Sequence, residues 1–228
     1  MKPWLFPICN FGFKCTLRLF SRCVIKGQEY IPKRGQVIFV ANHLSNLDPP
    51  ILAAISNRAP RFLAKKELFS ISLISFLLRS YGAFPVNRGK GDLRAINWAK
   101  KFMENNNATL ALFPEGTRDR NGKGLKLGQI GVAQIAVKSN AVIIPIGIMG
   151  TEKLQNMLRV FKPNADINIQ IGTPFLIKGV KEDKISRQQL DEITAEIMIR
   201  IARLLPEKMR GHYEHVSENP FSYTKNCV

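Results

Sequence analysis

The feature that most limits the folds open to this chain is the alternation of short apolar runs with segments of helical length. Apolar runs of strand length occur at 36–42, 61–64, 83–87, 109–113, 142–148 and 167–171. Segments of helical length lie at about 49–58, 67–80, 92–105, 128–139 and 186–205. Strands and helices that alternate in this way are typical of a sheet covered by helices. The sequence therefore predicts an α/β fold with a central sheet flanked by helices.

The length of the chain fits one main domain. Its 228 residues, 45% of them hydrophobic, can bury one sizeable core and leave little room for a second. The last helix is the best defined, because Ser186 can cap it and apolar residues recur at helical spacing up to Leu204. From residue 206 onward the sequence is polar and aperiodic, as in a tail or a loosely docked extension. We expect a main domain at 25–205 and a polar C-terminal tail at 206–228.

The first 24 residues have the pattern of a helix that lies in a membrane interface. Their apolar residues recur at helical spacing: Phe13, Leu17, Phe20 and Val24. Their basic residues follow a neighbouring stripe: Lys14, Arg18 and Arg22. The uncharged run at 3–13 is shorter than the roughly 20 residues of a spanning helix, and no A-x-A-like cleavage site follows it. We predict an amphipathic, membrane-associated segment at 1–24. The alternative is a helix packed on the protein's own core with a solvated basic edge.

The charge of the chain predicts an anionic partner. Lys and Arg number 34 against 17 Asp and Glu, which leaves a formal charge of +17. Nucleic acid, anionic lipid headgroups and phosphorylated small molecules all suit such a charge. The four cysteines, at 9, 15, 23 and 227, form no C-x-x-C pair and no regular framework. Neither a zinc site nor a disulfide scaffold is indicated, and we expect a reducing compartment.

The segment VIFVANHLSNLDPPILAA, at 37–54, carries a candidate general base. His43 follows a predicted strand, and loops at the carboxyl ends of strands are where α/β sheets bind ligands. An imidazole removes protons near neutral pH, and a carboxylate such as Asp48 can fix its tautomer. Asp48 can also be a helix N-cap, since Pro49 would then take the favoured first helical position. The two roles are compatible because a carboxylate has two oxygens.

A second candidate site follows the strand at 109–113, in the segment TLALFPEGTRDRNGKG. Gly116 would let a ligand approach the backbone closely, and the guanidinium of Arg118 can hold a phosphate bidentately. The alternative for Arg120 and Lys123 is that they belong to a solvated basic loop and bind no ligand. A third junction, YGAFPVNRGKG, ends in another cation, Arg88. The sequence contains no nucleophile elbow and no Walker-type lysine loop, so these loops indicate general-base activation of a hydroxyl on a phosphorylated molecule.

These segments resemble the ordered motifs of the glycerolipid acyltransferases, and most closely those of the 1-acylglycerol-3-phosphate acyltransferases. NHLSNLD matches the first motif, which makes His43 the catalytic base and Asp48 its partner. GAFPVNR is similar to the second and implies acceptor binding by Arg88. FPEGTR matches the third, and VIIPIGI, with Pro145 near the acyl-donor region, is similar to the fourth. The third motif implies these residues around the acceptor phosphate: Glu115, Gly116, Thr117 and Arg118. The resemblance runs from about residue 24 to 205.

One departure from the family pattern follows the third motif. Many members carry Phe, one or two basic residues and Gly there, whereas this chain has Leu125, Lys126, Leu127 and Gly128. Lys126 is kept as a possible phosphate ligand, and the finer assignment of the acceptor stays open.

The resemblance implies a reaction. His43 would take the proton from the sn-2 hydroxyl of a lysophosphatidic acid as that oxygen attacks the thioester of acyl-CoA or acyl carrier protein, giving phosphatidic acid. It also implies a mixed sheet, no metal or redox cofactor, and attachment to the cytoplasmic face of the cell membrane as a peripheral or monotopic protein. The positive charge would then serve both anionic lipid and phosphorylated substrate.

Two alternatives remain from the sequence. The same motifs serve acyltransferases that use another lysophospholipid or glycerol 3-phosphate. A basic nucleic-acid-binding protein is supported by the charge alone, because no RNP motif, zinc-finger spacing or basic heptad accompanies it. The sequence leaves the acyl chain length, the acyl donor and the oligomeric state undetermined.

Overall fold

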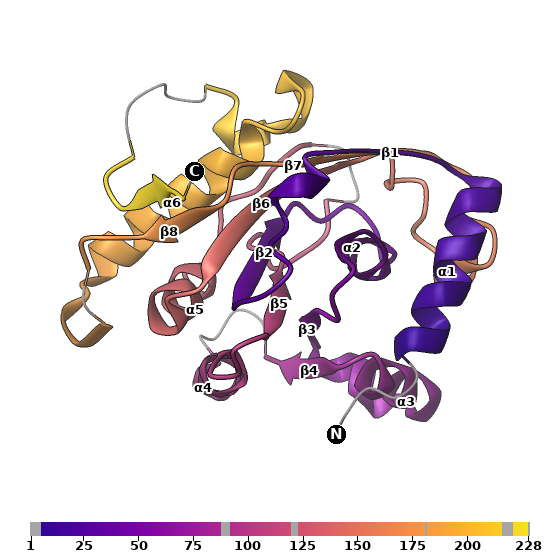
Figure 1. The fold of residues 1–228 in the computed structure, drawn as a ribbon, viewed down its shortest axis with the longest axis horizontal. Coiled ribbons are helices and arrows are strands. Elements are labelled where there is room, and N and C mark those ends of the chain that lie inside the picture. Colours follow the sequence, from indigo (N-terminus) through magenta and orange to yellow (C-terminus); the bar gives the residue numbers. More distant parts are fainter. Residues whose placement is uncertain (1–5, 88–91, 120–122, 181, 216–220, 228) are drawn as a thin grey trace.

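The computed structural model describes residues 6–87, 92–119, 123–180, 182–215 and 221–227. Its centre is a sheet with strand order β1-β7-β6-β2-β5-β3-β4, and β8 pairs with β6 and with β9 (Figure 1). The strands are β1 Arg22–Lys26, β2 Val37–Ala41, β3 Arg61–Lys65, β4 Ala83–Val86, β5 Thr109–Leu112, β6 Val142–Met149, β7 Asp166–Ile171, β8 Phe175–Ile177 and β9 Thr224–Asn226. Strands β2, β3, β4, β5 and β6 are parallel to one another, while β7 and β8 run antiparallel to β6. The predicted α/β fold with a mixed sheet is confirmed.

Helices cover both faces of the sheet (Figure 1). Helices α4, α5 and α6 pack on one face, and α1 and α2 pack on the other. The helices are α1 Phe6–Phe20, α2 Asp48–Ser56, α3 Ser72–Ser80, α4 Leu93–Met103, α5 Gly131–Ser139 and α6 Arg187–Ala202. Single turns of 3-10 helix include η2 Lys66–Ser70, η3 Met157–Val160, η5 Glu207–Met209 and η6 Gly211–Tyr213.

Strand β2 shows why the sequence folds in this way. All five of its residues are buried, as expected for a central parallel strand covered on both faces. Val37, Phe39 and Ala41 point into the core under α1 and α2, whereas Ile38 and Val40 point into the core under α4, α5 and α6. Since β2, β5 and β6 are parallel, their carboxyl ends meet at one edge of the sheet. We call this edge, which carries His43, the carboxyl edge.

All six predicted strands are present, with differences at other elements. The segment predicted as one helix at 67–80 is a 3-10 turn, η2, followed by α3. The helix predicted to begin at 128 begins at Gly131. Three short strands, β1, β8 and β9, were not predicted, because each pairs with a distant segment and has little pattern of its own.

The N-terminal helix corrects one prediction. Helix α1 ends at Phe20, and Val24 lies in β1 and not on the predicted helical stripe. Phe13 and Leu17 are only 3% and 6% exposed, because they pack on the core beside α2. These two residues of the predicted stripe therefore face the protein and not lipid, whereas Phe20 and Val24 are 40% and 39% exposed. A different set of apolar side chains on α1 is open to solvent, at 66%, 71% and 74% exposure: Ile8, Phe11 and Leu19. Nowhere in the described ranges is a helix both long and apolar enough to span a bilayer.

For the segment after α6, the sequence predicts a tail or a loosely docked extension, and the structure shows a docked segment. Residues 206–213, which we call the C-terminal strap, pack on the loop at 124–128. Leu125 N donates to Met209 O at 3.1 Å, and His212 N donates to Leu125 O at 2.9 Å. Further on, β9 pairs with β8, and Thr224 is buried. The described parts of the C-terminal region are thus docked. The division of the chain at 24/25 and 205/206 stays a prediction, and β1 crosses the first of these boundaries.

Candidate active site

His43 and Asp48 form a buried pair in the loop between β2 and α2. His43 Nδ1 lies 2.8 Å from Asp48 Oδ2, and the Asp48 side chain is fully buried. Strand β2 ends at Ala41 and α2 begins at Asp48, so the loop turns back on itself within a few residues. The structure therefore brings together the two residues that the sequence predicts as a base and its partner.

The Asp48 carboxylate is held on several sides. Its Oδ2 also accepts hydrogen bonds from the backbone N–H groups of Leu44 and Ser45, both at 2.7 Å. Its Oδ1 accepts from the hydroxyl of Thr151, also at 2.7 Å. Helix α2 has Leu47 at its N-cap position without a side-chain cap, so the alternative of Asp48 as the N-cap is wrong. A carboxylate fixed at both oxygens fixes the orientation of the imidazole bonded to it.

The imidazole has one nitrogen left for a ligand. The His43 ring stacks on Phe113 with centroids 4.1 Å apart and an interplanar angle of 21°. With Nδ1–H directed to Asp48, the lone pair belongs to Nε2, which is the arrangement of a general base. Among the residues that the structure describes, none forms a hydrogen bond with Nε2.

Glu115 ties the loop after β5 to the His43 loop. Its Oε1 accepts from the backbone N–H of His43 at 3.0 Å, and its Oε2 accepts from the backbone N–H of Lys126 at 3.1 Å. The backbone N–H of Asp119 adds a hydrogen bond to His43 O at 2.8 Å. Burial raises the pKa of Glu115 from 4.5 to about 7, against the opposite effect of the two N–H donors. Both oxygens of Glu115 are used to join two loops.

The cations of the third motif gather beside this junction. Gly116 adopts a positive φ of 68°, a conformation that favours glycine, and so turns the chain after Glu115. The Lys126 ammonium donates to Thr117 Oγ1 at 3.2 Å and to Arg118 O at 2.9 Å. Arg118 Nη1 donates to Gln155 Oε1 at 3.3 Å. Lys126 and Thr117 are exposed and Arg118 is half-buried, which places two cations where a phosphate can approach from solvent.

A third loop, after β6, completes the site, and sequence reasoning missed it. Thr151 binds Asp48, and the side-chain amide of Gln155 donates to Leu44 O at 2.6 Å. Asn42 bridges β2 to β6, because its side chain bonds both the N–H and the carbonyl of Ile148. The signal was present: Thr151 follows a strand in the way that His43 and Glu115 do, and parallel strands end at a common edge.

A cavity of about 200 Å³ adjoins these loops. Carboxylates of Glu115, Asp119 and Glu152 line it, and the C-terminal strap contributes Lys208. The strap approaches closely because Gly124 and Gly211 meet backbone to backbone, so a Cβ on Gly211 would lie 2.6 Å from Leu125 O. The strap therefore fixes the position of the loop that carries Lys126.

One predicted site residue lies away from these loops, and another lies outside the described residues. Pro145 is buried within β6 opposite Val40, below the loops, and its carbonyl accepts from Gly172 N at 2.9 Å. Arg88 lies outside the described residues, as does Arg120. Within the described ranges, no three His, Cys, Asp or Glu side chains are grouped as metal ligands.

Comparisons with known proteins bear on this geometry. The profile of the family described as "Acyltransferase" matches residues 22–149. A 1-acyl-sn-glycerol-3-phosphate acyltransferase of Streptococcus pneumoniae is 29% identical over 187 residues, which are 81% of this chain and 66% of that protein. A lyso-ornithine lipid O-acyltransferase of Pseudomonas aeruginosa is 27% identical over 171 residues, 68% of this chain and 65% of that protein. The chain thus spans about two thirds of the length of these relatives. The crystal structure of the 1-acyl-sn-glycerophosphate (LPA) acyltransferase from Thermotoga maritima matches with a TM-score of 0.60 at 29% identity, covering 85% of this chain and 76% of that chain.

Proposed function

The chain belongs to the acyltransferase family, whose profile covers more than half of it, and from this premise we propose that it acylates the sn-2 hydroxyl of 1-acyl-glycerol-3-phosphate to give phosphatidic acid. The observation that carries the proposal is the buried His43–Asp48 pair, 2.8 Å apart, beside the cations Arg118 and Lys126. The Streptococcus and Thermotoga relatives, both named for this acceptor, support the choice of substrate.

The reaction needs only a base and a thioester. His43 Nε2 accepts the proton of the acceptor hydroxyl while the hydroxyl oxygen forms a bond to the thioester carbonyl carbon. The carbon–sulfur bond then breaks, and the imidazolium returns its proton to the leaving thiolate. Asp48, held by Leu44, Ser45 and Thr151, keeps the ring oriented and stabilises its positive charge. The donor is acyl-CoA or acyl carrier protein, and Pro145 belongs to the donor side as the family resemblance implies.

In this proposal, the acceptor phosphate binds to the cations in and after the third motif. Arg118 can contact it bidentately, and Lys126 adds a second positive charge. Glu115 has a positioning role in this proposal, because its oxygens already accept from the backbone of His43 and Lys126. It keeps the base and the phosphate site at a fixed separation.

A panel of acceptors with both donor types, with products identified by mass, tests this function. We expect phosphatidic acid as the main product with 1-acyl-glycerol-3-phosphate. The variant Arg118→Ala should raise KM for this acceptor about 10- to 100-fold and leave KM for the donor nearly unchanged, since a charge-assisted hydrogen bond is worth about 1.5–3 kcal/mol. Arg187→Ala, an exposed arginine on α6, is the matched control. An equal effect of Arg118→Ala on both substrates would contradict the assignment.

A second acceptor class has its own support. The Pseudomonas relative is named for a lyso-ornithine lipid, and this chain departs from the common pattern at Leu125 to Gly128. If that class is the substrate, the same panel gives a higher kcat/KM with a lysolipid that lacks the glycerol phosphate. Other lysophospholipids and glycerol 3-phosphate belong in the panel for the same reason.

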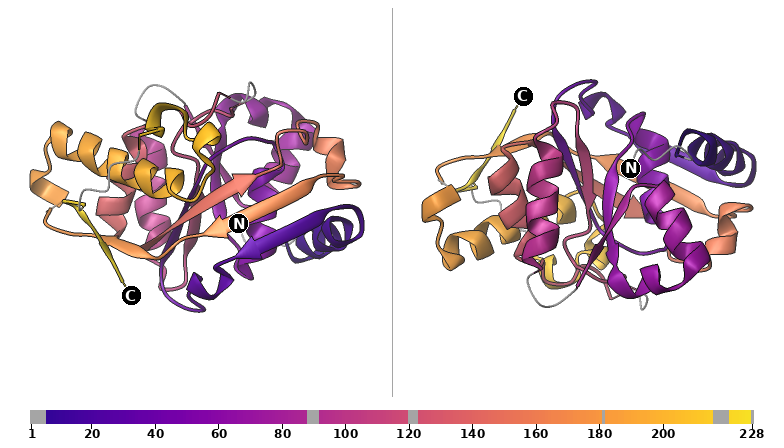
Figure 2. Two further views of the ribbon diagram at one scale, coloured as in Figure 1. Left: turned by 90° about the horizontal axis from the view of Figure 1, so that it is seen from above. Right: turned by 90° about the horizontal axis from the view of Figure 1, so that it is seen from below.

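We also propose that the protein rests on the cytoplasmic face of the cell membrane through α1 and the segment after β6. Thr16 Oγ1 donates to Val160 O at 2.8 Å, so α1 and η3 form one surface. Figure 2 shows the two segments on the same side of the molecule. Exposed apolar side chains lie on both: Phe11 and Leu19 on α1, and Leu158 and Phe161 in and after η3. Arg18, exposed on the same helix, would meet anionic headgroups.

Vesicle co-sedimentation tests the membrane proposal. The double variant Phe11→Ser and Leu19→Ser should move the protein toward the soluble fraction, because each side chain contributes roughly 1.5–3 kcal/mol if fully withdrawn from water. Activity on a short-chain acceptor dissolved in water should persist. Leu93→Ser, at a similarly exposed leucine on α4, is the control. Unchanged sedimentation of the double variant would show that this surface does not carry the binding.

A further inference from the structure

A second cleft, of about 340 Å³, opens at the opposite edge of the sheet, where β3 and β5 begin. We call this the amino edge. Its polar lining consists of the cations Lys33, Arg58 and Arg61 together with Asn105, Asn107 and Thr109. Among the described residues that line it, none has a carboxylate. From Thr109 to Glu115 the chain covers roughly 20 Å at about 3.3 Å per residue, so the cleft is separate from the candidate active site.

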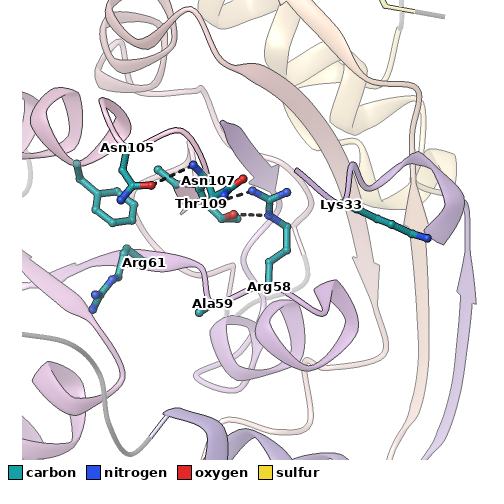
Figure 3. Close-up of a pocket in the computed structure, with 9 residues that line it drawn as sticks. Lys33, Arg58, Ala59, Arg61, Asn105, Asn107 and Thr109 are labelled. Carbon is teal, nitrogen blue, oxygen red and sulfur yellow. Dashed lines mark hydrogen bonds between the residues drawn. The ribbon is translucent and has the colours of Figure 1, made fainter. Parts of the chain in front are cut away.

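Arg58 builds one wall of the cleft (Figure 3). Its guanidinium donates to Thr109 Oγ1 at 2.5 Å, to the carbonyls of Pro32 and Gly35 at 2.6 Å, and to that of Asn107 at 3.2 Å. Burial lowers the pKa of Arg58. These bonds make Arg58 a structural clamp that holds the loops before β2 and β5 together, while its positive charge remains in the cleft.

Arg61 is placed differently. Its guanidinium lies over the Phe102 ring, 5.7 Å from the centroid, and packs against Gly82, where a Cβ would overlap it. The side chain is half-buried, and burial lowers its pKa. No hydrogen bond or ion pair joins it to any residue that the structure describes. A guanidinium has five N–H donors, and partly buried donors are normally paired. Arg61 is therefore an oriented cation with unused donors.

The two asparagines add further donors. Asn105 Oδ1 accepts from Asn107 N at 3.0 Å, and Asn107 Oδ1 accepts from Gly35 N at 3.2 Å. With each carboxamide oxygen occupied by a backbone N–H, the NH₂ groups are the parts left for a ligand. The cleft thus presents donors and positive charge, a combination that suits an oxyanion.

We propose that this cleft binds a phosphate ester, with the phosphoryl group on the fork of Arg61 and the remainder of the molecule along Asn105 and Asn107 toward Lys33. The planar guanidinium matches phosphate oxygens bidentately. The cleft is larger than a bare phosphate, so it has room for a small phosphorylated molecule. The phosphate ester is free in solution or belongs to an anionic lipid headgroup.

Calorimetric titration with inorganic phosphate and pyrophosphate tests the site on the full chain. The assay uses the Arg118→Ala background to remove binding at the acceptor-phosphate site. We expect binding to persist in Arg118→Ala and to weaken at least tenfold when Arg61→Met is added, whereas Arg61→Lys retains part of it. Affinity that is lost in Arg118→Ala but unchanged in Arg61→Met would overturn the proposal.

A second pair of variants guards against a folding defect in Arg61→Met. Asn105→Asp keeps the acceptor for Asn107 N but brings a negative charge into the cleft, so it should weaken pyrophosphate binding at least tenfold. Asn106→Asp, the next residue and outside the lining, is its matched control. Co-sedimentation with phosphatidic acid vesicles forms the second arm, again comparing wild type with Arg61→Met. If Arg61→Met weakens binding in the calorimetric titration, the phosphate ester is a soluble molecule. If it weakens binding to the vesicles, the phosphate belongs to a lipid headgroup. Unchanged binding in both experiments would refute the site.

Discussion

At each edge of the sheet one charged side chain holds the loops through several hydrogen bonds, a carboxylate at one edge and a guanidinium at the other. At the carboxyl edge the carboxylate of Asp48 accepts from two backbone N–H groups and a hydroxyl. At the amino edge the guanidinium of Arg58 donates to three carbonyls and a hydroxyl. Each has a neighbour with unused polar atoms, His43 Nε2 at one edge and the Arg61 guanidinium at the other. The comparison indicates that charged groups whose hydrogen bonds are made within the protein hold the loops in place. The neighbouring groups that still have unpaired donors or acceptors are the ones that contact the ligand.

The largest effect is expected for His43→Ala at the carboxyl edge. Loss of a general base should lower kcat by roughly 10²–10⁴. The free energy of unfolding should change little, because His43 contributes one side-chain hydrogen bond and a ring contact. Steady-state kinetics beside urea unfolding measures both, with the exposed His215→Ala as control. Near-normal turnover would remove His43 from the chemistry.

Arg58→Ala at the amino edge should show the reverse pattern. It removes four hydrogen bonds and takes this donor from the partly buried Pro32 carbonyl and Thr109 hydroxyl, which should lower the free energy of unfolding by about 2–4 kcal/mol. The kcat of the folded protein should stay near that of the wild type. Arg34→Ala, an exposed arginine in the loop before β2, is the matched control. A loss of kcat without a loss of stability would break the comparison between the edges.

Glu115 should make stability depend on pH at the carboxyl edge. Its pKa in the folded protein, about 7, lies above the ordinary value of 4.5 because the side chain is buried. The folded state therefore holds the proton more tightly, so this contribution is fully present below about pH 4.5 and is lost as the pH rises through 7. At about 1.4 kcal/mol per pKa unit the loss approaches roughly 3 kcal/mol.

Urea unfolding of wild type and Glu115→Gln across pH 4.5 to 8 measures this contribution. The variant lacks the titrating group. As the pH rises, the wild type should therefore lose more stability than the variant does. The NH₂ group of the glutamine would face the backbone N–H of His43 or Lys126, so two donors would meet and one hydrogen bond would be lost. The variant should therefore be less stable than the wild type at acid pH. Parallel pH profiles would show that burial does not perturb Glu115.

The smallest effect is expected at the C-terminal strap. Gly211→Ala would place a Cβ against the backbone of Leu125, and the strap would have to shift. We expect a loss of stability of about 1–3 kcal/mol and a raised KM for the acceptor. Gly179→Ala has a similar positive φ but open space around it, so it isolates the cost of the backbone conformation. Equal effects of the two substitutions would mean that the strap does not position the Lys126 loop.

The parts of the site that the sequence predicted are local in the chain. His43 and Asp48 are five residues apart, so the strand, the turn and the pair can be recognised together. Thr151 and Gln155 were missed because they bond residues more than 100 positions away. Such partners follow from strand order, which the hydrophobic pattern leaves open.

Two other regions show where the pattern misleads. Helix α1 has apolar residues on more than one side, and periodicity alone did not reveal that Phe13 and Leu17 face the core while Phe11 and Leu19 face solvent. The C-terminal strap is held by backbone hydrogen bonds and by glycines, which leave no apolar period in the sequence. Predictions from side-chain pattern fail where the backbone makes the contacts.

The pairing of β1 with β7 has a consequence for the order in which the molecule assembles. Arg22 pairs with Asp166 and Lys26 with Gln170. Strand β1 therefore cannot join the sheet until its partner, about 140 residues downstream, has been synthesised. At a synthesis rate of about 5–20 residues per second, that delay is roughly 7–30 s on the ribosome. Closing so long a loop is among the slower steps of folding. Strand β1 is therefore translated early and joined to the sheet late.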